Sequence, residues 1–313
     1  MTTTPRRILV VAHTGRPAAV TAAESVVRPL LAAGLEVQML EEEDADLDLS
    51  DVRVIAPGLA GSGCELVLVL GGDGTLLRGA ELARSTRTPL LGVNLGHVGF
   101  LAESEPDEID AIVEAIVGCR YRIEERMTID VEVHLDGEII VREWALNDAS
   151  VEKAARERML EIVAEIDGHP LSRWGCDGAV CATPTGSTAY AFSAGGPVVW
   201  PEVDALLLVP ISAHALFARP LVVGPDSVIA IELLHGTPGG VLWCDGRRTY
   251  PLPAGARVEV RRGAEPVRFA RLHDKPFTDR LVAKFELPVH GWRGRRSEWE
   301  RAIELPESGT SPD

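Results

Sequence analysis

Five consecutive residues, Gly71-Gly72-Asp73-Gly74-Thr75, combine groups that bind phosphate with a group that repels it. Glycines let the backbone come close to a ligand, and free N–H groups at the start of a helix form an anion site. A carboxylate suits such a loop only if it does chemistry or holds a cation. Asp73 could accept a proton from an attacking hydroxyl group or bind Mg²⁺, and we favour the proton acceptor. The alternative without chemistry is an ordinary Asp-Gly turn.

A second segment, residues 183–190, reads Thr-Pro-Thr-Gly-Ser-Thr-Ala-Tyr. Small hydroxyl residues crowd a predicted turn and helix start, where free N–H groups point outward. Ala189 leaves room for a flat ring, and Tyr190 can stack on that ring and donate a hydrogen bond. The segment suits a nucleoside and needs no net positive charge. The alternative is a capped helix with an ordinary hydroxyl-rich first turn.

The elements that position the glycine loop alternate between strand and helix. Continuous apolar runs at 8–12 and 66–70 are typical of strands buried on both faces, and 36–40 and 89–93 indicate two more strands. Helices are predicted at 17–33, 76–84 and 105–117, and Pro29 should kink or shorten the first of them. The acidic residues 41–51 are expected to form a solvated loop. This alternation predicts a Rossmann-like open parallel sheet, in which ligands bind beyond the carboxyl ends of the strands.

From residue 128 to about residue 260 the apolar residues recur with a period of two. Asp136-Gly137 and Asp167-Gly168 lie between strand-like runs, which is a hairpin signal. This pattern predicts an antiparallel, sandwich-like β domain. One helix is expected inside it at 185–194, and another follows at 277–285. With 313 residues, two domains are expected. The predicted limits are 1–119 for the α/β domain and 120–275 for the β domain, and the polar tail 294–313 is expected to be disordered.

Composition narrows the classes of partner. The formal charge of −16, from 31 Lys and Arg against 47 Asp and Glu, disfavours nucleic acid, whose binding depends on neutralised phosphates. The five cysteines form no C-x-x-C pair, so neither a zinc site nor a disulfide framework is expected and no protein-bound metal is predicted. Cysteines that stay reduced are typical of cytoplasmic proteins, so a cytoplasmic location is expected. The apolar run 8–12 is too short for a signal sequence or a membrane span.

Several motifs together give the chain a family resemblance. It resembles the bacterial NAD kinases, particularly those of actinobacteria, through motifs that appear in the family's order. They are GGDGT at 71–75, NLGHVGFL at 94–101, ALND at 145–148, CDG at 176–178, TPTGSTAYAFSAGGP at 183–197 and ARPLV at 218–222. The segment 277–293, ending Gly-Trp-Arg, is similar to the family's closing stretch. The resemblance therefore covers nearly the whole chain.

The resemblance implies a fold, a reaction and partners. The fold is that shared by NAD kinases and diacylglycerol kinases, with substrate in a cleft between the two domains and the segment 276–293 returning to the first. The implied reaction transfers a phosphoryl group from ATP to the 2′-hydroxyl of the adenosine ribose of NAD, giving NADP. Some relatives also use inorganic polyphosphate. A divalent cation such as Mg²⁺ accompanies ATP, and the family forms homodimers and homotetramers through the β domain.

The resemblance also implies roles for single residues. Asp73 would accept the proton of the ribose hydroxyl, and Asn147 and Asp148 would hydrogen-bond the dinucleotide. Many relatives have Glu in place of Asp148. The phosphate loop would comprise Gly71, Gly72, Gly74 and Thr75. The adenosine pocket would be lined by Thr188, Ala189, Tyr190, Ala191, Phe192 and Ser193, and Ser187 would also contact the substrate.

Four further residues complete the predicted site. Arg78, one helical turn after Asp73, could meet a phosphate; the alternative is a solvated helix face. Arg158 and Arg247 align with positions that contact the dinucleotide in relatives. Asp177 of the neighbouring subunit would contact the end of the dinucleotide that lies away from the adenosine.

Other functions are compatible with part of this pattern. Diacylglycerol and sphingoid-base kinases also carry GGDGT before a β domain, but they lack the 183–190 segment. A phosphofructokinase-like sugar kinase is a weaker alternative. A dinucleotide sensor without catalysis would not need the repulsive carboxylate of Asp73. A dehydrogenase is disfavoured because no G-x-G-x-x-G follows the first strand.

Overall fold

The computed structural model describes residues 5–13, 15, 17–44, 49, 51–95, 99–102, 108–155, 158–274 and 276–288. It divides into two compact units, Met1–Asp274 and Lys275–Asp313. The described part of the second unit holds helix α6 (Phe277–Phe285), which confirms the helix predicted at 277–285. The predicted tail, 294–313, lies outside the described residues. No helix in the described ranges is long and apolar enough to cross a membrane.

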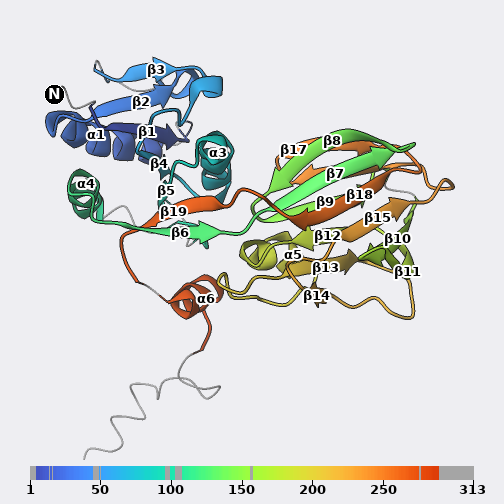
Figure 1. Ribbon diagram of the computed structural model, residues 1–313. Coiled ribbons are helices and arrows are strands. Elements are labelled where there is room, and N and C mark those ends of the chain that lie inside the picture. Colours follow the sequence, from blue (N-terminus) through green and yellow to red (C-terminus); the bar gives the residue numbers. More distant parts are fainter. Residues whose placement is uncertain are drawn as a thin grey trace, which may run out of the picture. The chain divides into compact units, whose positions relative to one another are not determined.

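The first sheet of the larger unit has seven strands in the order β3-β2-β1-β4-β5-β19-β6 (Figure 1). Six of them run parallel, and β6 pairs antiparallel with β19. The strands are β1 (Arg7–Ala12), β2 (Glu36–Leu40), β3 (Arg53–Ile55), β4 (Leu66–Leu70), β5 (Leu90–Val93), β6 (Arg122–Arg126) and β19 (Val267–Arg271). The predicted open parallel sheet is confirmed, with one antiparallel strand at its edge.

Helices cover both faces of this sheet, which explains its uninterrupted apolar strands. Ile8 and Val10 of β1 pack in a core with α1 (Pro17–Ala32) and α4 (Ile109–Val117). Leu9 and Val11, pointing the other way, pack in a core with α3 (Asp73–Ala83). Because successive side chains of a strand face opposite sides, both helical layers can bury the same strand.

Helix α1 continues through Pro29 to Ala32, with the fully buried Leu30 packed on the sheet. Pro29 therefore does not end the helix, and the expected kink stays a prediction. The expectation for residues 41–51 is wrong. The acidic stretch is not all solvated loop, since residues 41–44 form the short helix α2 (Glu41–Asp44). Within α2, Glu43 is only 2% exposed, whereas the Glu42 side chain is 61% exposed.

Two six-stranded antiparallel sheets form the predicted β sandwich (Figure 1). One has the order β11-β10-β15-β18-β7-β8 and the other β14-β13-β12-β9-β16-β17. Residues of both sheets share one hydrophobic core, including Val131 from the first and Leu208 from the second. Asp136 and Gly137 have φ values of 52° and 85°, the left-handed conformation that the predicted hairpin turn needs.

The strands of the sandwich have these bounds: β7 (Ile129–Leu135), β8 (Glu138–Ala145), β9 (Asp148–Lys153), β10 (Leu160–Ile166), β11 (His169–Cys176), β12 (Gly178–Ala182), β13 (Leu206–Ile211), β14 (Leu221–Val223), β15 (Ile229–Leu233), β16 (Gly240–Cys244), β17 (Arg248–Leu252) and β18 (Arg257–Arg262). The sequence pattern predicts six of these strands directly, at 129–135, 160–166, 178–183, 206–210, 228–233 and 257–261. The shorter strands β14, β16 and β17 were not predicted.

Strands β6 and β19 lie within the range 120–275 that the sequence pattern assigned to the β domain, yet both pair in the first sheet. Phe269 of β19 is fully buried there and aligns with Leu90 of β5. This pairing joins residues far apart in the sequence, so local periodicity cannot reveal it. The domain limits therefore stay predictions.

The helix predicted at 185–194 is broken into two short pieces. Residues Thr185–Thr188 form a 3₁₀ turn and Tyr190–Ser193 a single α-helical turn, separated at Ala189 with φ −100° and ψ −126°. The Thr183 hydroxyl accepts a hydrogen bond from the Gly186 N–H at 3.0 Å, at the start of the segment. The break turns the segment so that Ala189 and Tyr190 lie beside the neighbouring strand β9.

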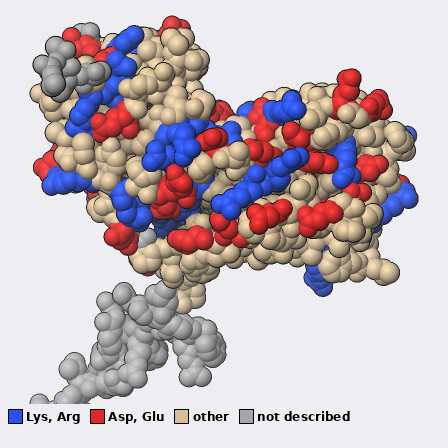
Figure 2. Space-filling model, in the orientation of Figure 1, with Lys and Arg blue, Asp and Glu red and all other residues tan. Residues whose placement is uncertain are grey.

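Charges of both signs are distributed over the molecular face in Figure 2. Lys and Arg residues alternate there with Asp and Glu residues, without a continuous basic area. Many of these charges are paired, as in the contact between Arg257 and Glu165 at 2.8 Å.

Candidate active site

The glycine loop lies between β4 and α3, at the carboxyl end of a buried parallel strand. A Cβ atom on Gly71 would lie 2.5 Å from Thr75 Oγ1, so this glycine is required by packing. At Gly72 and Gly74 a Cβ atom would meet nothing within 4 Å. These two glycines leave open space beside the backbone, which is where a ligand's phosphate can approach N–H groups.

Asp73 is the first residue of α3, and its carboxylate is held by two main-chain donors. The N–H groups of Phe100 and Leu101 each donate to one oxygen at 3.2 Å. A Cβ atom on Gly99 would lie 2.4 Å from Asp73 Oδ1, so Gly99 makes room for the carboxylate. The segment that ends in Gly-Phe-Leu thus orients Asp73, a role that the sequence analysis did not assign. The repeated glycines of NLGHVGFL were the available signal.

A cavity of about 800 Å³ lies beside the glycine loop. We call it the first cavity. It brings together six of the predicted site residues: Gly71, Gly72, Gly74, Thr75, Arg78 and Arg247. The other lining residues are His13, Ala18, Ala19, Glu42, Asn94 and Leu95. Glycine amides and two guanidinium groups on one wall suit a polyphosphate chain. The Asp73 carboxylate faces Phe100 and Leu101, and Asp73 is not among the lining residues.

Both arginines of the first cavity have carboxylate partners. Arg78 pairs with Glu42 and, through Nη1, lies 3.1 Å from Glu43 Oε1. Arg247 donates from Nε to Glu81 at 3.2 Å. The ion pairs restrain the guanidinium groups on the cavity wall, and they compete with any anion that enters.

A smaller cavity of about 350 Å³, the second cavity, brings the ALND motif and the segment 183–190 together. Asn147, Asp148, Ala189 and Tyr190, all predicted, line it with Ser150, Glu152, Trp243, Asp245 and Gly246. The motifs meet because β9 and β12 are neighbouring strands, in which Asp148 aligns with Ala182. The Thr183 N–H then donates to the Asn147 carbonyl at 2.9 Å, which fixes the turn after β12 against the start of β9.

Asp245 is a residue of the second cavity that the sequence analysis missed. It occupies a left-handed turn between β16 and β17 with φ 53° and is 7% exposed. Its carboxylate accepts N–H bonds from Leu146 at 3.0 Å and Asn147 at 2.7 Å, and pairs with Arg248 at 3.1 Å. Asp245 therefore holds the main chain of the ALND motif in place. The Asp-Gly pair after an apolar strand was the only signal in the sequence.

Two buried carboxylates, those of Asp148 and Asp245, line the second cavity. Burial, together with the charge of Asp245, raises the pKa of Asp148 to about 7, although the Tyr190 N–H bond acts in the opposite direction. Burial also raises the pKa of Asp245, against the effect of its N–H bonds and Arg248. A protonated Asp148 can donate a hydrogen bond as well as accept one, which suits recognition of sugar hydroxyls.

We expect Asp148→Asn to make the stability of the protein depend less on pH between about 4 and 7. The folded pKa of about 7 exceeds the ordinary value of 3.8, so between these values the unfolded chain releases a proton that the folded chain keeps. Stability then falls as pH rises through this window, by at most about 1.4 kcal/mol per pH unit. Asparagine cannot ionise and removes this slope. Thermal unfolding of both proteins from pH 4 to 8 measures the difference, and parallel curves would contradict the assignment.

Three residues of the hydroxyl-rich segment serve packing. The Ser187 hydroxyl contacts the N–H of Val199 at 2.9 Å and its carbonyl at 3.1 Å. The Thr188 hydroxyl donates to the Thr185 carbonyl at 3.3 Å. Ala191 is fully buried in a small core with Val180 and Val209. These contacts fold the segment so that its neighbours Ala189 and Tyr190 reach the second cavity.

The remaining predicted residues are more dispersed. Phe192 and Ser193 are exposed. Arg158 lines a separate depression with Met159 and Arg173. Asp177 pairs with Lys153 beside Tyr190, adjoining a further cavity of about 380 Å³. Binding roles for these four residues stay predictions, as do those of Ser187, Thr188 and Ala191.

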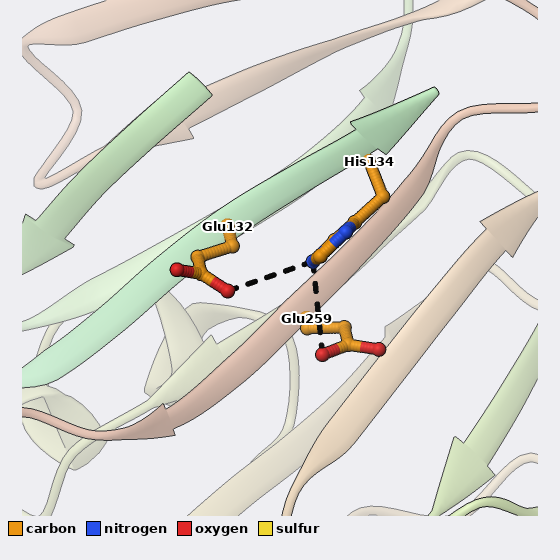
Figure 3. A group of neighbouring side chains, drawn as sticks. All are labelled: Glu132, His134 and Glu259. Carbon is orange, nitrogen blue, oxygen red and sulfur yellow. Dashed lines mark ion pairs between the residues drawn. The ribbon is translucent and has the colours of Figure 1, made fainter. Parts of the chain in front are cut away.

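One cluster in the described ranges has the side chains of a metal site (Figure 3). His134 Nε2 lies 3.6 Å from Glu132 and 3.7 Å from Glu259. However, Arg261 Nη2 lies 3.0 Å and 3.2 Å from the same two carboxylate oxygens. Arg142 also pairs with Glu132 at 3.2 Å and Arg257 with Glu259 at 3.0 Å, so arginines already compensate both carboxylates. The cluster lies on β7 and β18, and none of its residues lines either cavity. We therefore assign it to sheet stabilisation.

Comparison with known proteins identifies the family. The model of the ATP-NAD kinase N-terminal domain matches residues 8–121, and that of the ATP-NAD kinase C-terminal domain matches residues 146–272. The chain belongs to the NAD kinase family. "NAD kinase 2" of Streptomyces avermitilis is 64% identical over 296 residues, covering 93% of this chain and 98% of that protein. The NAD kinase of Thermobifida fusca is 61% identical over 306 residues, covering 95% and 94%.

Solved structures of NAD kinases share the fold. Yeast NADH kinase complexed with NADH superposes with a TM-score of 0.84 at 22% identity, over 92% of this chain and 89% of that chain. An NAD kinase from Archaeoglobus fulgidus in complex with ATP gives a TM-score of 0.66 at 23% identity, over 90% and 98%. At these identities the likeness concerns the fold. It confirms the predicted combination of an α/β domain with a β domain.

Proposed function

We propose that the chain is an NAD kinase, which transfers a phosphoryl group from ATP to the 2′-hydroxyl of the adenosine ribose of NAD and releases NADP. The observation that carries this proposal is the near full-length identity of 64% and 61% to NAD kinases, with the catalytic motifs intact. The lipid kinase and sensor alternatives have no support among these relatives. The second cavity, lined by Asp148, Glu152 and Asp245, is also too polar for an acyl chain.

In the proposed reaction the two cavities have different tasks. The first binds phosphates of the donor through the amides at Gly72 and Gly74 and through Arg78. The second binds part of the dinucleotide through Asn147 and Asp148. Asp73, oriented by the N–H groups of Phe100 and Leu101, accepts the proton of the ribose hydroxyl as its oxygen attacks the γ-phosphorus. Positioning and electrostatics supply most of the acceleration.

We propose that Mg²⁺ enters with the donor. In proteins Mg²⁺ is usually held by one or two carboxylates together with substrate phosphates. The carboxylate that lines the first cavity, Glu42, is paired with Arg78, and that of Asp73 is held by main-chain donors. These residues fit a cation whose main ligands are phosphate oxygens, with Glu42 or Asp73 as an additional ligand. When bound, the cation would neutralise charge on the triphosphate.

The direct test is a phosphorylation assay. Purified protein is incubated with Mg²⁺ and ATP and with NAD, NADH or diacylglycerol as separate acceptors. We expect NADP to form from NAD, and inorganic polyphosphate in place of ATP tests the second donor. Phosphorylated lipid without NADP would overturn the proposal.

The state of the protein in the cell is a further part of the proposal. The family resemblance implies a homodimer or homotetramer, in which Asp177 of one subunit would reach the binding site of its neighbour. A cytoplasmic location is also proposed. All five cysteines are free and three of them are buried, which agrees with a reducing compartment. Light scattering after size exclusion measures the oligomer, and Asp177→Asn should weaken NAD binding only if the oligomer forms.

A further inference from the structure

A buried arginine contacts the segment that holds Asp73. Arg271 is the last residue of β19 and is only 2% exposed, although a guanidinium group stays charged in a protein. Its Nη1 donates to the carbonyl oxygen of Leu101 at 3.3 Å. The N–H of the same residue, Leu101, donates to Asp73 Oδ1 at 3.2 Å. A single residue of main chain therefore connects the buried guanidinium group to the carboxylate that the proposed reaction uses.

The side chain of Leu101 is anchored as well as its main chain. It is 4% exposed and lies in the core that contains Leu76 of α3 and Phe269 of β19. The guanidinium carbon of Arg271 lies 5.0 Å from the centre of the Phe269 ring, on the same side of the strand. Packing keeps Leu101 in place, and the hydrogen bond from Arg271 sets the direction of its main chain, because hydrogen bonds depend on angle as well as distance.

The charge of Arg271 is balanced by Glu124 of β6. The Nε of Arg271 donates to this carboxylate at 3.0 Å, and Glu124 also pairs with Arg126. Taking such a pair out of water is costly, and replacing a buried ion pair with apolar side chains is often neutral for stability. Stability alone therefore does not account for an arginine at this position. The pair with Glu124 leaves the Nη1 of Arg271 directed at the Leu101 carbonyl.

We propose that Arg271 is a positioning residue for the general base. Its hydrogen bond to the Leu101 carbonyl holds the Leu101 N–H, and through it the Asp73 carboxylate, in the orientation that accepts the proton of the ribose hydroxyl. This inference rests on the proposed function, in which Asp73 is that base. Arg271 is not among the residues that line either cavity, so its loss should lower turnover without a matching loss of substrate binding.

Steady-state kinetics of Arg271→Met in the full chain, with NAD, Mg²⁺ and ATP, test this role. Methionine fills much of the space but donates no hydrogen bond to Leu101. We expect kcat to fall about 10- to 100-fold, since a misplacement of about 1 Å can cost 10²-fold. The KM values for NAD and ATP should stay within about threefold of the wild type. If this variant does not fold, Arg271→Met combined with Glu124→Gln leaves no unpaired carboxylate and gives the same test.

The same substitution in the Asp73→Asn protein separates positioning from a general loss of structure. If Arg271 acts through the Asp73 carboxylate, Arg271→Met should change the residual kcat of Asp73→Asn by less than about twofold. A merely structural role would lower kcat by the same factor in both backgrounds. Labelled ATP makes the residual turnover measurable.

Arg268, on the same strand, serves as the control. Its Nη1 donates to the carbonyl oxygen of Arg87, also at 3.3 Å, and its Nε lies 3.6 Å from Glu125 of β6. Arg268→Met therefore removes the same two kinds of contact, one to a main-chain carbonyl and one to a carboxylate of β6. Because Arg87 does not hold Asp73, the kcat of this variant should stay at the wild-type value.

The outcomes distinguish this inference from the proposed function. A wild-type kcat in Arg271→Met would overturn the role of Arg271, as would a loss explained by KM, an equal loss in the Asp73→Asn background or an equal loss in Arg268→Met. In each of these cases the proposed function stands if the wild type forms NADP. If the wild type forms no NADP, the proposed function is wrong, and this inference fails with it.

Discussion

Asp73→Asn is expected to lower kcat by about 10²- to 10⁴-fold, the usual contribution of a positioned general base. Asparagine retains one oxygen for a main-chain donor but cannot accept the proton of the ribose hydroxyl. Because Asp73 contributes little to the second cavity, binding of NAD should remain nearly intact. Steady-state kinetics with saturating ATP, together with calorimetric binding of NAD, measure both quantities.

The matched control for this variant is Asp110→Asn. Asp110 is likewise the acidic residue in the first turn of its helix, α4, so the variant removes the same charge beside a similar helix dipole. Its kcat should stay at the wild-type value. Turnover by Asp73→Asn at the same level would exclude a role for the carboxylate both as a base and as a cation ligand.

Gly186→Ala is expected to destabilise the protein by about 3 kcal/mol or more and to abolish tight binding of NAD. An added Cβ atom would lie 1.9 Å from the carbonyl oxygen of Asn147 and 2.7 Å from its Cα. These are main-chain atoms, so the clash is relieved only if the turn at 183–190 moves away from the ALND motif. Urea unfolding and NAD titration report the two effects.

Gly58→Ala provides the comparison, because a Cβ atom there would meet nothing within 4 Å and Gly58 has no positive φ. Its unfolding midpoint should match that of the wild type. A Gly186→Ala protein with an unchanged midpoint would mean that the close approach to Asn147 is not needed for folding.

The parts of the fold that depend on residues close together in the sequence were predicted well. The apolar run Leu66–Leu70 gave a fully buried strand, and Asp136-Gly137 gave a hairpin turn, because each signal and its structure lie in one short segment. Strand β19 was different, since its strand partners lie in β5 and β6, far away in the sequence. Its periodicity carries no information about which sheet it joins.

The site shows the same division. The glycine loop could be located from residue types, because backbone amides and a carboxylate do recognisable chemistry, whereas the ALND motif was located through the family resemblance. Glu43 and Asp245 were overlooked, since an acidic residue is ordinarily solvated and only the tertiary structure buries these two, at 2% and 7% exposure. The fates of Ser187 and Ala191 were equally hidden. Both side chains are buried by residues outside the segment, Val199 for Ser187 and Val180 and Val209 for Ala191, and residue types alone do not reveal such contacts.

Strands β6 and β19, the antiparallel pair at the edge of the first sheet, show where the β sandwich is inserted into the chain. Arg126, where β6 ends, aligns with Val267, where β19 begins. The chain therefore enters and leaves the sandwich at adjacent points of the first sheet. In topological terms, residues 127–266 are a long insertion into a β-hairpin. A tight turn could close that hairpin, and neighbouring chain ends are what make an inserted module exchangeable. The β sandwich could thus be replaced in evolution while the first sheet kept its strand order.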